Sequence, residues 1–138
     1  RADLAGQFSL GRFSMNLQSL ERTYIDKVFA LCDYYLQGKS KRYSRHLYDI
    51  YKLTPLIEFN DRFAALIQEV REHRSKMQIC PSADETVDVP AVIFEFCDNS
   101  FYREDYQAIT DYFAKDAVSY DDVIGQMRTL AASNLFEK

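Results

Sequence analysis

The stretch ERTYIDKVFALCDYYLQGKSKRYSRHLYDIYKL, residues 21–53, decides the fold because it holds two helix patterns joined by a short polar turn. In the first pattern, apolar residues recur at helical spacing, at Ile25, Val28, Phe29, Cys32 and Leu36. Gly38 follows them, and glycine commonly ends a helix. The second helix is predicted from about residue 41 to Leu53, with one side formed by Tyr43, Leu47, Ile50 and Tyr51.

The ends of these two helices have local signals. The first helix is predicted to begin near Ser19 or Thr23, because Thr23 and Asp26 have the spacing of a capping box. The second should end at Thr54-Pro55, since the residue before a proline is pushed out of helical dihedrals.

Helical patterns continue to the C-terminus. A third helix is predicted over about residues 60–76, a fourth opens at Asp88, a fifth covers about residues 102–115, and a sixth opens with Ser119 and Asp122 as a cap pair. On the third helix a solvated face is predicted for Glu69, Arg71, Glu72 and Arg74.

Residues 1–20 differ from the rest, because their apolar residues from Phe8 to Leu17 mostly alternate, which is typical of a strand. A strand needs a sheet to join, so we expect this segment to join a sheet in a part of the protein that precedes Arg1. The sequence therefore predicts one mainly α domain over residues 1–138. It combines a bundle of about five to six helices over residues 21–138 with a short β element at the N-terminus.

Composition excludes several classes of protein. No apolar run is long enough to span a bilayer, and the first residues lack the features of a signal peptide, so a cytoplasmic location is expected. The three cysteines are widely spaced and only two histidines occur, which favours buried, reduced thiols over disulfides or a zinc site.

The charge is unevenly distributed. The net charge of -4 argues against a protein that coats long nucleic acid, yet one short window concentrates the basic residues Lys39, Lys41, Arg42, Arg45, His46 and Lys52. Such a window suits a phosphate-bearing ligand or a short piece of RNA. A solvated helix face balanced by acids elsewhere explains it equally well.

Lys27 and Asp49 are the candidates for chemistry, since no nucleophile elbow, phosphate loop, dinucleotide fingerprint or zinc-protease motif occurs. If the two helices pack antiparallel, Lys27 lies about ten residues before the turn and Asp49 about nine after it, so they reach a similar height. The lysine could then neutralise a triphosphate, and the carboxylate could orient a metal-bound or hydroxyl group. A simple interhelical salt bridge accounts for the same spacing, and spacing alone favours it.

Aromatic residues are dense in the same stretch, which contains Tyr34, Tyr35, Tyr43, Tyr48 and Tyr51. Tyrosine can stack a nucleobase, although tyrosines at this spacing more often fill the rim of a helical core. His46 is a candidate acid, base or phosphate contact, with a surface histidine as the favoured alternative.

Two runs in this stretch, TYIDK at residues 23–27 and RHLYDIY at 45–51, resemble the AbiEii/AbiGii toxin family of nucleotidyltransferases. That family shows a Thr-x-x-Glu-Lys helix start and a later Arg-Asp-Leu-Tyr-Asp-Leu run. The resemblance is clear from about Phe13 to Leu53, and the later helices are similar to the family's C-terminal part. Asp26 replaces the usual glutamate and His46 the usual first aspartate. The family's metal motif, a Gly-Ser start with paired acids on an N-terminal sheet, does not occur in this chain.

The resemblance implies that Lys27 and Asp49 are catalytic, and the substrate-binding candidates beside them are Arg22, Thr23, Lys41, Arg42, Arg45 and His46. It also implies transfer of a nucleotide from a nucleoside triphosphate, with Mg²⁺, to an acceptor such as the 3′ end of a tRNA or a protein hydroxyl. A cognate antitoxin is an implied partner. Because the metal motif is absent, we expect this chain to hold half of the site, to bind no metal itself, to bind nucleotide weakly and to catalyse nothing.

Two non-catalytic alternatives stay open. One is a helical module that binds a partner protein, such as an antitoxin, through its tyrosine-rich face. The other is an RNA-binding module whose affinity falls steeply with salt and depends on Lys41, Arg42 and Arg45.

Overall fold

The structure, a computed structural model, describes residues 17–41, 43–76, 81–84, 87–110, 118–133 and 135–136. These residues form six α-helices and two short 3-10 helices, and they contain no strand, so the mainly α prediction is confirmed. In chain order the elements are α1 (Leu17–Leu36), α2 (Arg45–Leu53), η1 (Thr54–Leu56), α3 (Asp61–Ser75), η2 (Pro81–Ala83), α4 (Val89–Asp98), α5 (Arg103–Thr110) and α6 (Tyr120–Ala132). None of the helices in these ranges is both long enough and apolar enough to cross a membrane.

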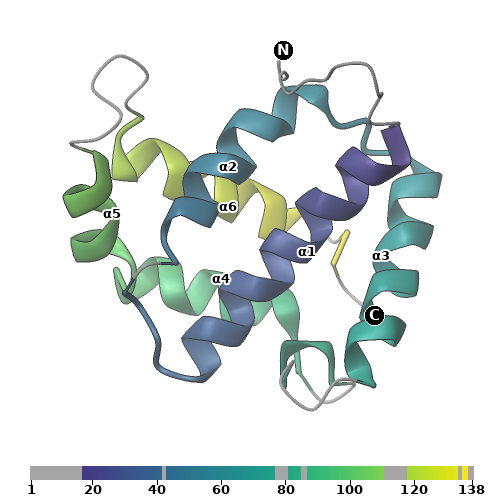
Figure 1. Cartoon of the computed structure of the whole chain (residues 1–138), viewed down its shortest axis with the longest axis horizontal. Coiled ribbons are helices and arrows are strands. Elements are labelled where there is room, and N and C mark those ends of the chain that lie inside the picture. Colours follow the sequence, from purple (N-terminus) through teal and green to yellow (C-terminus); the bar gives the residue numbers. More distant parts are fainter. Residues whose placement is uncertain are drawn as a thin grey trace.

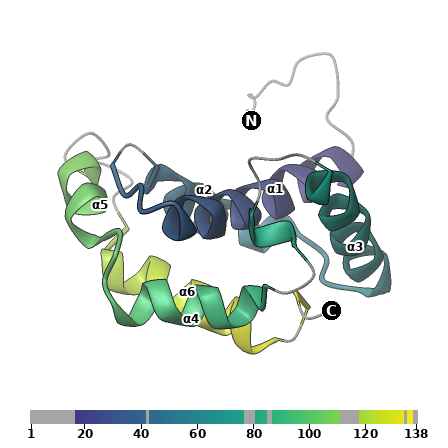
Figure 2. The same ribbon diagram turned by 90° about the horizontal axis from the view of Figure 1, so that it is seen from below.

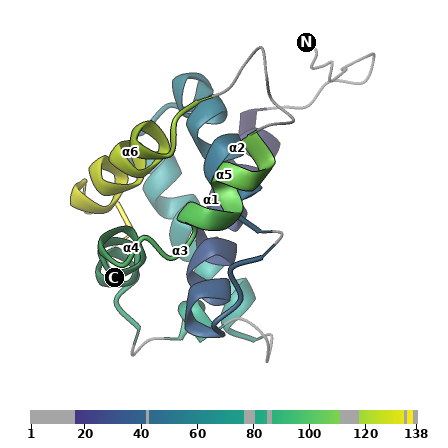
Figure 3. The ribbon, with the colours of Figure 1, turned by 90° about the vertical axis from the view of Figure 1, so that its left-hand side faces the viewer.

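The helices form two layers (Figures 1 and 2). Helices α1, α2 and α3 make one layer, α4 and α6 make the other, and α5 lies at one end of the molecule. Figure 3, seen from the α5 end, shows α4 and α6 together on one side of the α1–α2 layer. Helix α1 contacts α2, α3, α4 and η2, so it is the element around which the others pack.

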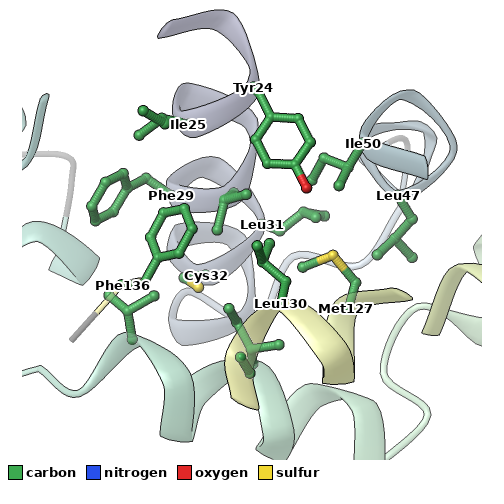
Figure 4. Packing of buried hydrophobic residues seen from close by; sticks show 14 of the residues in the cluster. Tyr24, Ile25, Phe29, Leu31, Cys32, Leu47, Ile50, Met127, Leu130 and Phe136 are labelled. Atoms are coloured by element: carbon green, nitrogen blue, oxygen red, sulfur yellow. The ribbon is translucent and has the colours of Figure 1, made fainter. Parts of the chain in front are cut away.

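The core lies between these layers and is centred on α1. Tyr24, Phe29 and Leu31 of α1 are fully buried. Figure 4 shows them meeting side chains of α2 and α6 and the ring of Phe136, near the C-terminus. Burial of an aromatic or large aliphatic side chain contributes about 1.5–3 kcal/mol each, so this shared cluster is the main force that joins the layers.

Several helix ends follow the predicted local signals. Asn60, Asp88 and Ser119 each occupy an N-cap, and each side chain accepts a hydrogen bond from the backbone N–H three residues on. Gly38 ends α1 at φ 72°, while Gly38 N–H bonds Tyr35 O and Lys39 N–H bonds Tyr34 O. This pair of bonds is a Schellman motif, which requires the left-handed backbone that glycine adopts easily.

Helix α1 begins two residues before the earlier of its two predicted starts, Ser19 and Thr23, and the predicted cap at Thr23 is wrong. The helix begins at Leu17, so Thr23 and Asp26 lie inside it and form no cap. Asp26 instead pairs with Arg74 of α3 at 3.3 Å. Residues 17–20, placed in the predicted β element, are helical, and the rest of that element, residues 1–16, lies outside the described residues.

The other boundaries shift less. Helix α2 begins at Arg45, four residues later than predicted, and after Leu53 the chain continues as the 3-10 turn η1 through Thr54 and Pro55. Helix α5 is described from Arg103 to Thr110, and the remainder of the predicted fifth helix, residues 111–115, falls outside the described ranges.

The predicted solvated face of α3 is wrong for its two arginines, although Glu69 and Glu72 are exposed. Arg71 is buried and Arg74 is mostly buried, because both guanidinium groups lie over the ring of Phe29. Arg74 pairs with the buried carboxylate of Asp33 at 2.8 Å, and Arg71 donates to the backbone oxygen of Phe136 at 2.5 Å. The apolar stripe of α3 thus continues into two arginines whose charges find buried partners.

Candidate functional site

Lys27 and Asp49 meet across the seam between α1 and α2. Lys27 Nζ donates to Asp49 Oδ2 at 3.2 Å. The prediction that the two residues reach the same height is therefore confirmed. About a fifth to a quarter of each side chain is exposed, 22% for Lys27 and 24% for Asp49, so the pair is accessible to a ligand yet partly shielded from water.

The seam has a regular antiparallel register. Tyr24 near the start of α1 is hydrogen-bonded to Thr54 at 3.0 Å, Lys27 reaches Asp49, and Tyr34 near the end of α1 stacks on Tyr43. Residue numbers rise along α1 as they fall along α2 and the turns at its two ends, which is the register of an antiparallel helix pair. The short turn after Gly38 enforces this arrangement.

A second cation shares the same carboxylate. Arg45 Nε lies 3.6 Å from Asp49 Oδ1, one helical turn away on α2, and the Arg45 side chain is 63% exposed. Two cations therefore face one anion. The cluster Lys27–Asp49–Arg45, which we call the cationic cluster, carries a net charge of about +1 at neutral pH.

His46 lies beside this cluster. Burial, reinforced by the nearby charge of Lys27, lowers the pKa of His46 below its ordinary value, although Asp49 opposes this shift. The imidazole is therefore neutral at pH 7. Its Nδ1 is buried and has no hydrogen-bond partner among the described residues.

An aromatic stack occupies the other end of the seam. The rings of Tyr34 and Tyr43 stack with centroids 3.7 Å apart and planes 16° apart. The imidazole of His46 lies nearly parallel to Tyr34, at 6.1 Å and 7°. Tyr34, Tyr48 and Tyr51 also pack against the hydrophobic core, as predicted for residues at its rim.

The remaining predicted substrate-binding residues are spread more widely. Thr23 is exposed one helical turn before Lys27, on the same face of α1. Arg22 lies five residues before Lys27, a rotation of about 140°, so it belongs to a different face. Lys41 is exposed in the turn before α2, and Arg42 lies outside the described residues.

Sequence reasoning missed the residue that fixes the start of α2. Ser44, which is fully buried, donates from its hydroxyl to Asp105 Oδ2 of α5 at 2.5 Å and from its backbone N–H to the same oxygen at 3.3 Å. A carboxylate at a helix N-terminus is favourable, and this one is supplied by a distant helix. No local pattern could reveal a pair separated by sixty-one residues.

A second missed feature lies behind α1. The buried carboxylate of Asp33 accepts from Arg74, from the backbone N–H of Ser82 at 2.8 Å and from its hydroxyl at 2.5 Å. This network fixes α1, α3 and η2 together on the side of α1 that faces away from Asp49. The signal in the sequence was an aspartate on the apolar face of α1 and an arginine on the apolar face of α3.

The residues at the seam do not fit a magnesium site. Mg²⁺ prefers several oxygen ligands, whereas Asp49 is the carboxylate of the cationic cluster and both of its oxygens face cations. In the described part of the chain, no three His, Cys, Asp or Glu side chains cluster in a way that could hold a metal ion.

The two described cysteines, Cys32 and Cys97, are buried, and burial raises the pKa of the Cys97 thiol to about 12, so both behave as apolar core residues.

Comparison with known proteins gives one match along nearly the whole chain. The model of a family described as "Nucleotidyl transferase AbiEii toxin, Type IV TA system" matches residues 2–131. The matched region includes the α1–α2 seam and all but the last residue of α6. No significant match is found among curated proteins or among solved structures.

Proposed function

The chain belongs to the family of AbiEii nucleotidyl transferase toxins of type IV toxin–antitoxin systems, and on that premise we propose that its cationic cluster binds the triphosphate of a nucleoside triphosphate. The single observation that carries this proposal is the sharing of one carboxylate by Lys27 and Arg45. The family match confirms the resemblance seen in residues 23–27 and 45–51.

The charges of the cluster suit a polyphosphate. Lys27 has three N–H donors, of which Asp49 accepts one, so others remain to bind phosphate oxygens. Arg45 adds a planar guanidinium that matches phosphate geometry. Because Lys27 is partly buried, its interaction with an anion is screened less than that of a fully exposed lysine.

The proposed roles follow from this arrangement. Lys27 stabilises the negative charge that grows on the phosphates as the nucleotide is transferred, which is a typical role for a fixed cation in phosphoryl chemistry. Asp49 orients the two cations while the site is empty. Arg45, the more exposed cation, is the first to meet the incoming nucleotide.

We further propose that the acceptor is a hydroxyl such as the 3′ end of a tRNA. The chain on its own should bind nucleotide and transfer none, because the Gly-Ser motif with paired acids occurs nowhere in its sequence. Incubation of the chain with labelled nucleotide and tRNA tests this directly. Labelled tRNA would contradict the proposal that this chain holds only part of the catalytic site.

Isothermal titration calorimetry with ATP, without added metal, tests the phosphate-binding role. Lys27→Ala should weaken ATP binding by about tenfold, the equivalent of ~1.4 kcal/mol for one charge-assisted contact. The matched control is Arg128→Ala. It also removes one positive charge, but from an exposed ion pair with Asp98 at 2.7 Å between α6 and α4.

The control separates a specific site from general attraction. If both variants weaken ATP binding equally, only the net charge matters and the proposed site is wrong. If neither variant changes it, Lys27 does not bind phosphate.

A second candidate is a surface that binds the antitoxin. Leu56 and Phe59, three residues apart just after α2, are 59% and 42% exposed, and exposed large apolar side chains are typical of interaction surfaces. The same titration distinguishes the two candidates, because an interaction module would bind ATP no better with Lys27 than without it.

A further inference from the structure

The seam between α1 and α2 has a cationic end and an aromatic end, and we propose that it orients a single nucleotide, with the phosphates at the cationic cluster and the base stacked on Tyr43. This inference rests on the proposed function and adds to it the position of the base. It assigns a nucleobase-binding role to the stack of Tyr34 and Tyr43.

The two ends lie on one continuous face. On α1, Lys27 and Tyr34 are seven residues apart, which is two helical turns on the same face and a distance of about 10 Å along the axis. On α2, Asp49 and His46 are three residues apart, and Tyr43 lies in the turn just before this helix, three residues before His46. A nucleoside triphosphate extended from its terminal phosphate to its base has a comparable length.

His46 connects the two ends. Its ring lies nearly parallel to that of Tyr34, while the charges of Lys27 and Asp49 act on the same imidazole. The space between cluster and stack is thus filled by a neutral aromatic ring, against which a ribose can pack without meeting an unpaired charge.

The packing contacts of Tyr43 differ from those of the neighbouring tyrosines. Tyr34, Tyr48 and Tyr51 pack against the hydrophobic core, whereas within the described part of the chain the half-buried Tyr43 rests on the ring of Tyr34. The Tyr34 ring is fixed by the core, so it provides a rigid base for the stack. A nucleobase lying on Tyr43 would extend an existing stack by one ring, and base–aromatic stacking is worth about 1–3 kcal/mol per base.

The test compares two probes, ATP and inorganic tripolyphosphate, by isothermal titration calorimetry of the whole chain without added metal. Tyr43→Ala should weaken ATP binding by about tenfold, because it removes the stacking ring, and should leave tripolyphosphate binding unchanged. Tyr43→Phe, which keeps the ring, should bind ATP like the wild type. Lys27→Ala should weaken the binding of both probes.

The matched control is Tyr35→Ala. Tyr35 is next to Tyr34 in the chain but faces α4, where its hydroxyl donates to Glu95 at 2.6 Å and accepts from Asn99 at 2.8 Å. This variant should bind ATP like the wild type, which excludes a general effect of removing a tyrosine from the C-terminal part of α1.

The possible results test the base position on Tyr43 separately from the phosphate site at Lys27. If Tyr43→Ala weakens neither probe, or weakens both equally, or if Tyr43→Phe loses as much ATP affinity as Tyr43→Ala, the base is not stacked on Tyr43. The phosphate site survives all three results as long as Lys27→Ala still weakens both probes. If Lys27→Ala weakens neither probe, the proposed function fails first and the base position fails with it.

Discussion

His46 combines features that a surface histidine does not have. Its ring is partly buried, lies parallel to Tyr34 and is subject to the charges of three ionised neighbours, Lys27, Asp49 and Arg45. The family resemblance places an aspartate at this position. A neutral imidazole here leaves Asp49 as the carboxylate between Lys27 and Arg45, which keeps the cationic cluster positive.

The lowered pKa of His46 predicts that acid destabilises the fold. The unfolded chain protonates this group near its ordinary pKa of about 6.5, whereas the folded chain resists protonation until a lower pH. Between these two pKa values the unfolded state binds more protons, so the free energy of unfolding falls as the pH drops through this window. Urea unfolding at pH 7.5 and 5.5 measures the loss, which should be smaller in His46→Gln.

His73 provides the control, because it is exposed on α3. His73→Gln should show the same loss of stability on acidification as the wild type. An unchanged pH dependence in His46→Gln would mean that other groups cause the acid sensitivity.

For single residues, the sequence predicts the position of a side chain along its helix better than it predicts the partners that bury it. Lys27 and Asp49 could be selected from their spacing, since helical rise gives the height of each side chain. The amphipathic pattern of α3 predicts a solvated face that includes Arg71 and Arg74. Their burial depends on Asp33 and on the backbone of Phe136, partners from distant parts of the chain that no local pattern specifies.

The α1–α2 hairpin is the element that makes the site. Its turn is predictable, because glycine at the end of an apolar stripe is a strong stop signal. The rotation of one helix against the other is not, because it depends on which faces pack and on the contact of Ser44 with Asp105. The predicted cap at Thr23 is wrong because the spacing of Thr23 and Asp26 also occurs inside helices. The alternating residues before it gave no sign that the helix had already begun.

Alanine substitutions at two glycines compare the stability effect at the left-handed turn of Gly38 with that at an ordinary helix position, Gly125. Gly38→Ala should lower the free energy of unfolding by about 1 kcal/mol, since a side chain at φ 72° is strained even with open space around it. Gly125→Ala, in the middle of α6 and equally open, should raise it by about 0.5–1 kcal/mol, because alanine favours a helix interior. Thermal unfolding followed by circular dichroism gives both values. A stabilising Gly38→Ala would contradict the left-handed backbone at this turn.

In the whole molecule, α1 and α2 lie in one layer, and α4 and α6 lie against the other side of it (Figure 2), where the buried ring of Phe136 also packs. The site therefore needs the entire bundle, because α1 can hold Lys27 in register with Asp49 only while its other faces remain packed. The amphipathic patterns predicted a bundle of helices, but not how its layers pack. They also did not predict that Phe136, which lies beyond the last residue of the family match, would complete the core.

The hydrophobic core extends along the chain as far as Phe136. Its ring is fully buried edge-to-face against Phe29 at 5.9 Å, and its backbone oxygen accepts from Arg71. Phe136→Ala should therefore cost about 3–5 kcal/mol, a large part of the 5–15 kcal/mol typical of a whole domain. Phe59→Ala, which removes a ring that is 42% exposed, should cost much less. The midpoint of urea unfolding at constant slope measures both losses. Equal losses would mean that the C-terminal residues are not part of the core that holds α1, and that the register of Lys27 and Asp49 is maintained by the remaining helices alone.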